Sequence, residues 1–572
     1  MKNEYKLRVN AFLMILINLI YIILSEKLNN NKRNLNNRYN IKIKISDDNY
    51  IDDDDDFDDI DVIDDVDIIS LGCLFYFYEI PDLVYLNDYR IYLNNECLKI
   101  ANNNLKDENT LILEWSYKIN DMSHFFYFAR KNVLEIDFSE FDASEVTSMC
   151  QLFFGCSKLK SIQFGKISTL SLIYMDYMFY GCKSLSSIDL SNFNTTNVEK
   201  MNDMFNGCSS LTSLDLTNFD TSNVFSMDYM FYGCSSLTSL DISNFNTSQL
   251  YTMYNFFYGL ESIKELDLSS LDTSEVIFMD FFLGECKSLT SIRINLTITN
   301  AYSLKGFFCN CSSLMFIEFL QFDTSSVVDM SYMFYGLKSF TSLDLSTFNT
   351  SNVQYMQYMF AESSSLISIN FTGFDISKTF YMDFMFYRCF SLVSLDLSSF
   401  IFNQVDINDF FHHCHSLTSI KFSSHYQLPN SVENMFKDCF SLLSIDFSNF
   451  DFGIIDNMQS FFSGCTKLTS INLSSFDTFS VDNMKHMFYG CSSLTEIDTE
   501  WITSSVLDIN SMFYDCFSLI SLDLAMFDTS FVTNMKGLFY NCAKLTSIDL
   551  KHFKTNEVTD MQSMFYGCES LK

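Results

Sequence analysis

Apolar residues recur with a period of about 26 residues over most of the chain, and the repeated unit is clearest at 230–253, MFYGCSSLTSLDISNFNTSQLYTM. In this copy Leu237, Leu240, Ile242 and Phe245 form the pattern L-x-x-L-x-L-x-x-F. Successive residues of a strand point to opposite sides. L-x-L therefore predicts one short strand with two inward apolar side chains and an outward middle residue. One such repeat cannot bury its apolar side chains by itself. We therefore expect successive repeats to stack as coils and to bury these side chains against one another.

The segment M-x-x-M-F of each copy places apolar residues three and four apart, which is typical of one face of a short helix. A residue that tolerates the left-handed conformation follows and is expected to end that helix. This position holds Gly155, Gly181, Gly207, Gly233, Gly259, Gly336, Gly464, Gly490 and Gly567, or else Asn310, Asp438, Asp515 and Asn541. The sequence predicts an α/β repeat fold, a leucine-rich-repeat solenoid with one short parallel strand and a short helical turn per coil.

Cysteines follow the left-handed position, and they are separated by one repeat period or by a multiple of it. These stations are Cys156, Cys182, Cys208, Cys234, Cys286, Cys311, Cys389, Cys414, Cys439, Cys465, Cys491, Cys516, Cys542 and Cys568. Leu260, Leu337 and Ser363 fill the three missing stations, which gives 17 stations, and an earlier copy near Met122 lacks the cysteine. We therefore expect a solenoid at 122–572 with about 17–18 coils.

The residues before the repeats divide into three parts. Basic residues precede the apolar run 11–24, so 1–25 is expected to be a signal peptide or an uncleaved signal anchor. The segment 26–70 is rich in Asn and Lys and then carries eleven Asp between positions 52 and 67. This like charge predicts a disordered, solvated linker. Residues 71–121 are apolar enough to cap the first coil.

The repeats resemble those of the BspA-like leucine-rich-repeat surface proteins. The shared text is M-F-x-x-C-x-x-L-x-x-L-D-L-S-x-F-D-T-S-x-V-x-x-M, and the resemblance covers about 122–572. It implies a solenoid that is displayed on a cell surface or released from it, with a role in adhesion or in contact between host and microbe. It implies no catalytic residues.

Composition narrows the classes of partner. The 572 residues include 36 basic and 71 acidic side chains, for a formal net charge of −35. This charge disfavours nucleic acids and anionic lipids and leaves cationic or protein ligands as partners. Phosphate-binding glycine loops, nucleophile elbows, metalloprotease helices and C-x-x-C pairs are absent from the sequence. We expect no enzymatic activity and no cofactor.

The outward residue of L-x-L is the candidate binding face. Asp occupies it at Asp137, Asp189, Asp215, Asp241, Asp267, Asp344, Asp396, Asp446, Asp498, Asp523 and Asp549. Coils stacked ~4.8 Å apart would place these carboxylates in a column, where neighbours are expected to raise one another's pKa. One hypothesis is a binding face for cationic ligands or basic proteins. The other is a solvated sheet face that repeat duplication copied.

Two features raise the question of metal binding. The station accepts Leu, so its cysteines are expected to be buried free thiols rather than disulfides or zinc ligands. His412, His413, Cys414 and His415 form a local cluster that could bind a transition metal. Cys414 is expected to face the core, and consecutive residues rarely converge on one ion. The sequence therefore predicts no metal site.

These observations favour a non-enzymatic, secreted or cell-surface repeat protein that mediates adhesion or protein binding through its exposed sheet face. The alternative is a membrane-anchored or intracellular scaffold. The sequence ends at Leu571 and Lys572, inside an expected strand. This predicts either a truncated product or end-to-end self-association through the last coil.

Overall fold

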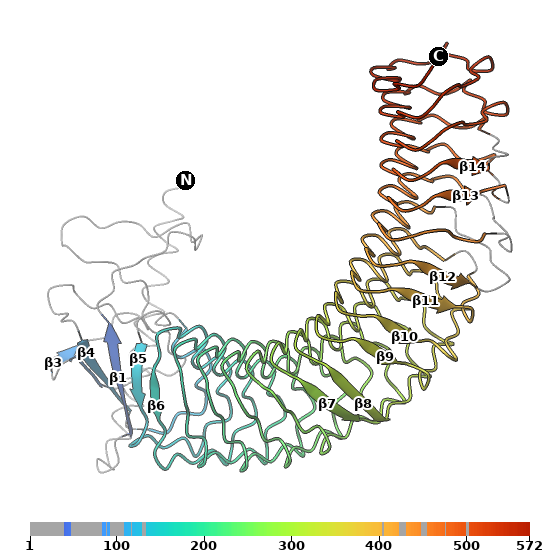
Figure 1. Ribbon diagram of the computed structural model, residues 1–572. Helices are drawn as coiled ribbons and strands as arrows, with labels where there is room; N and C mark the ends of the chain where they lie inside the picture. The colour runs from blue at the N-terminus through green and yellow to red at the C-terminus, as the bar shows by residue number, and fades with distance from the viewer. Residues whose placement is uncertain are drawn as a thin grey trace, which may run out of the picture.

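The protein folds as a curved solenoid whose first end joins a mixed β-sheet (Figure 1). This computed structural model describes residues 39–46, 83–86, 89–91, 108–115, 117–127, 133–402, 405–422, 431–447, 455–474, 476, 478–498 and 503–572. The predicted signal segment and the Asp-rich run lie outside these residues. Within the described ranges, no helix is long and apolar enough to cross a membrane.

The first end of the solenoid is closed by a six-stranded sheet in the order β3-β2-β4-β1-β5-β6. Its strands are β1 (Tyr39–Ser46), β2 (Leu83–Leu86), β3 (Tyr89–Ile91), β4 (Glu108–Trp115), β5 (Val133–Asp137) and β6 (Ser161–Gln163). β1 pairs antiparallel with β5 of the first coil, and β5 pairs parallel with β6 of the second. The strand that pairs directly with the first coil therefore comes from 39–46, and 71–121 contributes β2, β3 and β4 to the same sheet.

Strand β1 corrects the expectation of a disordered linker over the whole of 26–70. Ile41, Ile43 and Ile45 alternate with polar residues, which is the period of a strand with one buried face. Ile41 and Ile43 are fully buried, and they lie in the same core as Trp115. The Asn- and Lys-rich composition of the segment concealed this alternation.

Later L-x-L segments pair in parallel, as predicted, in four pairs of coils. The strands are β7 (Ser291–Asn295), β8 (Phe316–Gln321), β9 (Ser342–Asp344), β10 (Ser368–Asn370), β11 (Ser394–Leu397), β12 (Ser419–Phe422), β13 (Ser470–Asn472) and β14 (Glu496–Asp498). β7 pairs with β8, β9 with β10, β11 with β12, and β13 with β14. Other L-x-L segments, such as 214–216, form no ladder. One strand per coil is therefore an overestimate.

The predicted helical turn in each coil is wrong. No helix occurs among the described residues, and M-x-x-M-F folds as consecutive tight turns. In one coil the Met178 N–H donates to the Met175 carbonyl (3.3 Å) and the Tyr180 N–H to the Tyr177 carbonyl (3.1 Å), three residues back rather than four. Tyr177 has φ of 57°, a left-handed value that an α-helix does not contain.

The alternate backbone N–H groups of this segment bond to the next coil. In the following coil four such bonds measure 2.7–3.0 Å, and they run from Met201, Asp203, Phe205 and Gly207 to carbonyls of Ser226, Asp228, Met230 and Tyr232. The predicted left-handed position before each station is confirmed, for example at Gly181 (φ 70°) and Asn310 (φ 57°). Two left-handed residues per coil turn the chain so that its N–H groups point along the stack.

The two sides of this coil differ in their backbone bonding to neighbouring coils. Where the same coil passes the strand side, one backbone hydrogen bond joins Thr212 to Ser186 of the previous coil (3.1 Å) among the described residues. In this coil the turn face therefore has more backbone hydrogen bonds to its neighbour than the strand face has. In Figure 1 the tight turns line the inside of the arc, and strands β7–β14 lie toward its outside.

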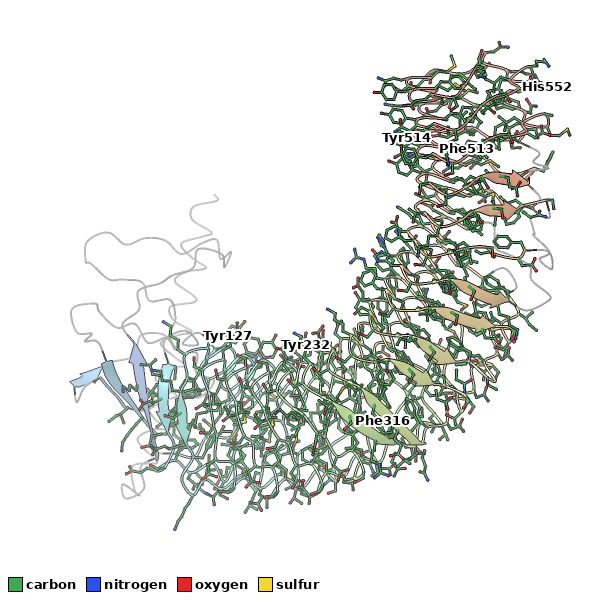
Figure 2. All side chains as sticks on the ribbon, viewed as in Figure 1. Tyr127, Tyr232, Phe316, Phe513, Tyr514 and His552 are labelled. Carbon is green, nitrogen blue, oxygen red and sulfur yellow. The ribbon has the colours of Figure 1, made fainter. Side chains whose placement is uncertain are left out.

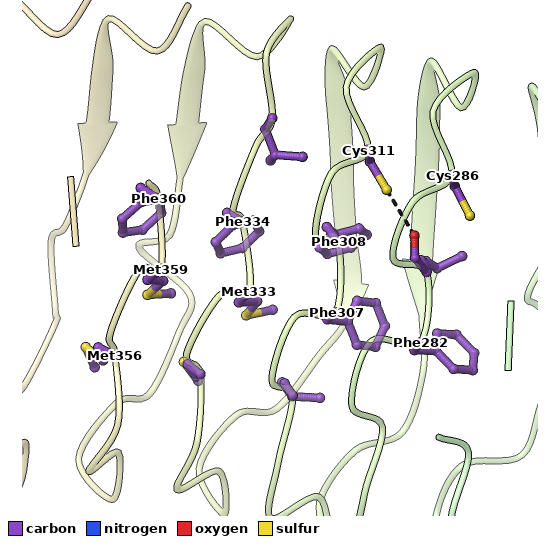
Figure 3. Close-up of a cluster of buried hydrophobic side chains, with 14 of the residues drawn as sticks. Phe282, Cys286, Phe307, Phe308, Cys311, Met333, Phe334, Met356, Met359 and Phe360 are labelled. Atoms are coloured by element: carbon purple, nitrogen blue, oxygen red, sulfur yellow. Dashed lines mark hydrogen bonds between the residues drawn. The ribbon is translucent and has the colours of Figure 1, made fainter. Parts of the chain in front are cut away.

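The core is built from columns of identical side chains, as predicted. Figure 3 shows stacked Phe and Met side chains from successive coils, with the thiol of Cys311 directed at a carbonyl of the previous coil. The rings of Phe334 and Phe360 are 5.6 Å apart with planes at 3°. Cys311 Sγ donates to the Leu283 carbonyl (3.0 Å), and Ser363 makes the equivalent bond to Phe334 (2.9 Å). In these coils the side chain at the station satisfies one buried carbonyl, whereas Leu260 and Leu337 fill the station with an apolar group.

A buried threonine column forms a second internal ladder. Thr221 Oγ1 donates to the carbonyl of Asn246 in the next coil (2.9 Å) and accepts from its N–H (2.7 Å). Thr195 makes the same two bonds to Asp220 (2.9 and 2.8 Å). Each hydroxyl thus satisfies both backbone groups of one residue at the turn after the strand.

Candidate binding faces

The predicted Asp column lies on the strand side of the coils, toward the outside of the arc. Its side chain is half-buried at Asp137 and exposed at Asp189, Asp215, Asp241, Asp267, Asp344, Asp396, Asp446, Asp523 and Asp549. The side chain of Asp498 falls outside the described residues. A row of negative charge is therefore present on this side, and the surface that carries it is convex.

Most of these carboxylates hold a turn. Oδ1 accepts the backbone N–H two residues later at 2.8–3.0 Å in nine copies, at Asp137, Asp189, Asp215, Asp241, Asp267, Asp344, Asp396, Asp523 and Asp549. This Asx turn ends the strand and directs the chain into the next turn. Asn370 and Asn472 fill the same position and accept the same bond. In these copies the position uses an Asx oxygen, with or without charge.

The expected rise in pKa along this column is wrong. Hydrogen bonds from the hydroxyl and N–H of Thr217 lower the pKa of Asp215, and neighbouring Asp189 and Asp241 oppose this only weakly. At Asp396 the bond from Lys421 Nζ (2.8 Å) lowers the pKa to about 2. Local donors stabilise each charged form more than the adjacent carboxylates destabilise it.

The inside of the arc carries an aromatic column that we did not predict. It consists of the residue two before the station: Tyr127, Phe154, Tyr180, Tyr232, Tyr258, Tyr335, Tyr387, Tyr489, Tyr514, Tyr540 and Tyr566. Figure 2 shows its members Tyr127, Tyr232 and Tyr514 along the concave edge, with Phe316 on the opposite side. Tyr232 stacks on Tyr258 with centroids 4.8 Å apart. We call this set the concave aromatic column.

Its rings are half-buried, and Tyr566 is 62% exposed. Burial is the main reason that the pKa of Tyr258 is raised, and Glu285 adds to the effect. The recurrent Tyr of MFYGC was visible in the sequence. The curvature of the solenoid places this Tyr on a concave face, and apolar periodicity does not report that curvature.

Acidic residues accompany these rings in the coils near the first end. Asp176, Asp228 and Asp280 occupy one column, and Asp203 lies beside it. Burial raises the pKa of each, so their charged forms lack part of the solvation they would have in water. Asp228 still accepts bonds from Thr252 Oγ1 (2.8 Å) and the Tyr254 N–H (2.9 Å). A cationic group bound at this face would stabilise the charged form of these carboxylates.

The stacked coils and their ladders define a solenoid repeat protein of the leucine-rich type. A family model described as "Mycoplasma protein of unknown function, DUF285" matches residues 120–214, 210–316, 302–424, 430–521 and 495–572. These matches cover well over half of the chain, which therefore belongs to this family. A search of the curated proteins gives no significant match.

Several solved structures show a likeness. A leucine-rich cell-surface protein from Faecalibacterium prausnitzii is 20% identical, and the alignment covers 50% of this chain and 79% of that one with a TM-score of 0.32. A leucine-rich-repeat protein from Leptospira interrogans is 11% identical over 67% and 93% of the two chains, with a TM-score of 0.16. At these TM-scores the likenesses carry no argument about ligands.

Proposed function

We propose that this protein is a non-enzymatic binding protein, secreted or displayed at the cell surface, whose concave face holds a protein partner with a basic surface. The concave aromatic column carries this proposal. Tyr side chains offer a large contact area and lose little conformational entropy on binding. Such rings recur in many coils and are adjacent in runs such as Tyr489, Tyr514, Tyr540 and Tyr566, which allows many weak contacts to add.

The charge of the face favours a basic partner. Guanidinium groups stack on aromatic rings and pair with carboxylates, so arginine suits a surface that combines both. Arg388 already lies 5.0 Å from the ring centroid of Tyr387. The net charge of −35 adds long-range attraction for a basic protein.

The outer Asp column is the second candidate face, supported by its row of exposed carboxylates. Matched substitutions distinguish the two faces. Ser463 occupies the concave column, and Asn370 and Asn472 occupy the Asp column, so Tyr→Ser and Asp→Asn are each tolerated by other coils. We would measure fluorescence anisotropy of labelled oligoarginine and oligolysine peptides with Tyr232→Ser/Tyr258→Ser and with Asp215→Asn/Asp241→Asn.

The Tyr pair is expected to weaken oligoarginine binding more than oligolysine binding, because only guanidinium stacks well. The Asp pair is expected to weaken both equally and slightly, through charge alone. A larger loss of affinity in the Asp pair would assign binding to the outer face.

Cellular location tests the surface part of the proposal and the scaffold alternative. A tagged chain in its source cell is expected to be cleaved by protease added to intact cells, or to be recovered from the medium. Protection in intact cells, with cleavage after permeabilisation, would favour an intracellular scaffold.

A further inference from the structure

Three side chains from two adjacent coils converge where the cluster of histidines interrupts the concave aromatic column. Figure 2 places members of that column on the inside of the arc, and His412 occupies the same repeat position as Tyr387. His413 occupies the left-handed position, with φ of 63°, and Asp438 occupies it in the next coil, with φ of 57°. Equivalent backbone conformations project these two side chains alongside each other.

The polar atoms of the three side chains lie close together, and one pair has the separation of two ligands on one ion. His413 Nδ1 lies 3.3 Å from Asp438 Oδ2, and His412 Nε2 lies 3.8 Å from the same oxygen. One ligand atom from each of the three residues lies within 4.8 Å of the others. Two ligands at about 2.0–2.2 Å from a tetrahedral ion are separated by roughly 3.3–3.6 Å.

The buried imidazole of His412 gives independent evidence that an ion binds here. Its residue is 9% exposed, and its Nε2 atom is buried without a hydrogen-bond partner. Its other nitrogen, Nδ1, lies 2.6 Å from Asp409 Oδ1. A carboxylate that holds one imidazole nitrogen fixes the tautomer and leaves the second lone pair for a metal, which is the arrangement of carboxylate–histidine–metal triads.

We propose that His412 Nε2, His413 Nδ1 and Asp438 Oδ2 form a binding site for a divalent first-row transition-metal ion such as Zn²⁺. Two imidazole nitrogens and one carboxylate oxygen match the ligand preference of this class, and a fourth position stays open. The two imidazoles are stacked, with centroids 4.2 Å apart, so one ring turns about its Cβ–Cγ bond to aim at the ion. Cys414 is no ligand, because its thiol is buried and donates to the Phe386 carbonyl (3.1 Å).

The local charge suits a dication. Asp409 and Asp438 together offset two positive charges, and the nearby Arg388 is paired with Glu362 at 3.0 Å. Lys437 is the other cation near His412.

The other coils supply substitutions that fit each position. Tyr replaces His412 in the previous coil, and Asn occupies the column of His413 and Asp438 at Asn310 and Asn541. The test titrates Co²⁺ and Zn²⁺ into the full chain and into His412→Tyr, His413→Asn and Asp438→Asn, with calorimetry and Co²⁺ ligand-field absorption as readouts. His552→Asn is the control, because Figure 2 shows His552 away from the concave edge and Asn occupies its column at Asn218.

One ion per chain is expected, with a ligand-field spectrum that includes nitrogen ligands. Each ligand substitution is expected to weaken binding by at least roughly 100-fold, and Asp409→Asn by about 10-fold, since outer partners cost 10- to 100-fold. His552→Asn should bind as the unmodified chain does. Absence of binding, or binding that survives all three ligand substitutions, would overturn the site, provided that thermal unfolding shows the variants folded.

Discussion

Tyr514 stacks on Tyr540 with ring centroids 4.2 Å apart and planes at 0°. Their neighbours Phe513 and Phe539, which lie deeper in the same two coils, are also parallel but 5.7 Å apart. The separation of equivalent side chains therefore increases from the concave edge into the core. This difference matches the curvature of the arc, whose inside carries the Tyr514 column (Figure 2).

Hydrogen exchange tests whether the turn side of a coil has stronger backbone hydrogen bonding than its strand side. In the coil that contains Met201–Gly207, the turn amides that bond to the next coil are expected to exchange more slowly than the amides of 213–216 on the strand side. Mass spectrometry of exchanged, digested protein measures both segments in one sample. Faster exchange in the turn segment would contradict the assignment of the turns as the more strongly bonded face.

The threonine ladder predicts a specific loss of stability. Thr221→Val keeps the shape of the side chain but leaves the N–H and carbonyl of Asn246 without their partner. We expect the free energy of unfolding to fall by about 1–3 kcal/mol in urea denaturation. The exposed residue Ser213 provides the control, and Ser213→Ala is expected to change stability by less than about 0.5 kcal/mol. Equal effects would show that the ladder contributes nothing particular.

The Asx turns predict a loss of stability in acid. Their carboxylates have lowered pKa values in the folded chain, so their contribution is present above the ordinary pKa of 3.8 and is lost as pH falls through the folded value, about 2 for Asp396. Asn keeps the same hydrogen bond without titrating. Asp215→Asn/Asp241→Asn/Asp267→Asn should therefore have a smaller decrease in melting temperature between pH 5 and about pH 2 than the unmodified chain.

The cysteine column predicts a loss of stability in base. Burial raises the pKa of Cys234 from 9.0 to about 12. Its protonated form is favoured in the folded chain, so this contribution is complete below pH 9 and is lost as pH rises toward 12. Ser363 shows that serine fits this station. Cys234→Ser should therefore lose less free energy of unfolding between pH 9 and pH 12 than the unmodified chain loses. Buried thiols should also resist alkylation until the chain is denatured, and rapid labelling of Cys234 in the native protein would contradict this assignment.

The sequence could reveal the parts of the fold that depend on burial. Leu237 and Ile242 are buried, and Gly181 is left-handed, as predicted. The helical turn could not be distinguished from consecutive tight turns, because both place apolar residues three and four apart. The second left-handed position carries residues as different as Tyr177, Asp203 and Gly306, so it gave no consistent conformational signal.

Proximity between coils explains why the sequence did not suggest the histidine site that we propose. We considered His412, His413 and Cys414 as consecutive residues, and consecutive residues seldom share an ion. The third candidate ligand, Asp438, lies one coil later and occupies the same repeat position as His413. A search for chemistry within each column of the repeat, rather than within each segment, would have paired them.

Site-specific photo-crosslinking tests the central claim that partners bind on the inside of the arc. A benzophenone amino acid would replace Tyr232 on the concave face or Phe316 on β8, which is 56% exposed on the opposite side. Each protein would be irradiated on intact source cells, and its crosslinked species would be compared. We predict crosslinks to a basic protein from position 232 and none from position 316. Crosslinks from position 316 alone would contradict the account and assign binding to the outer face.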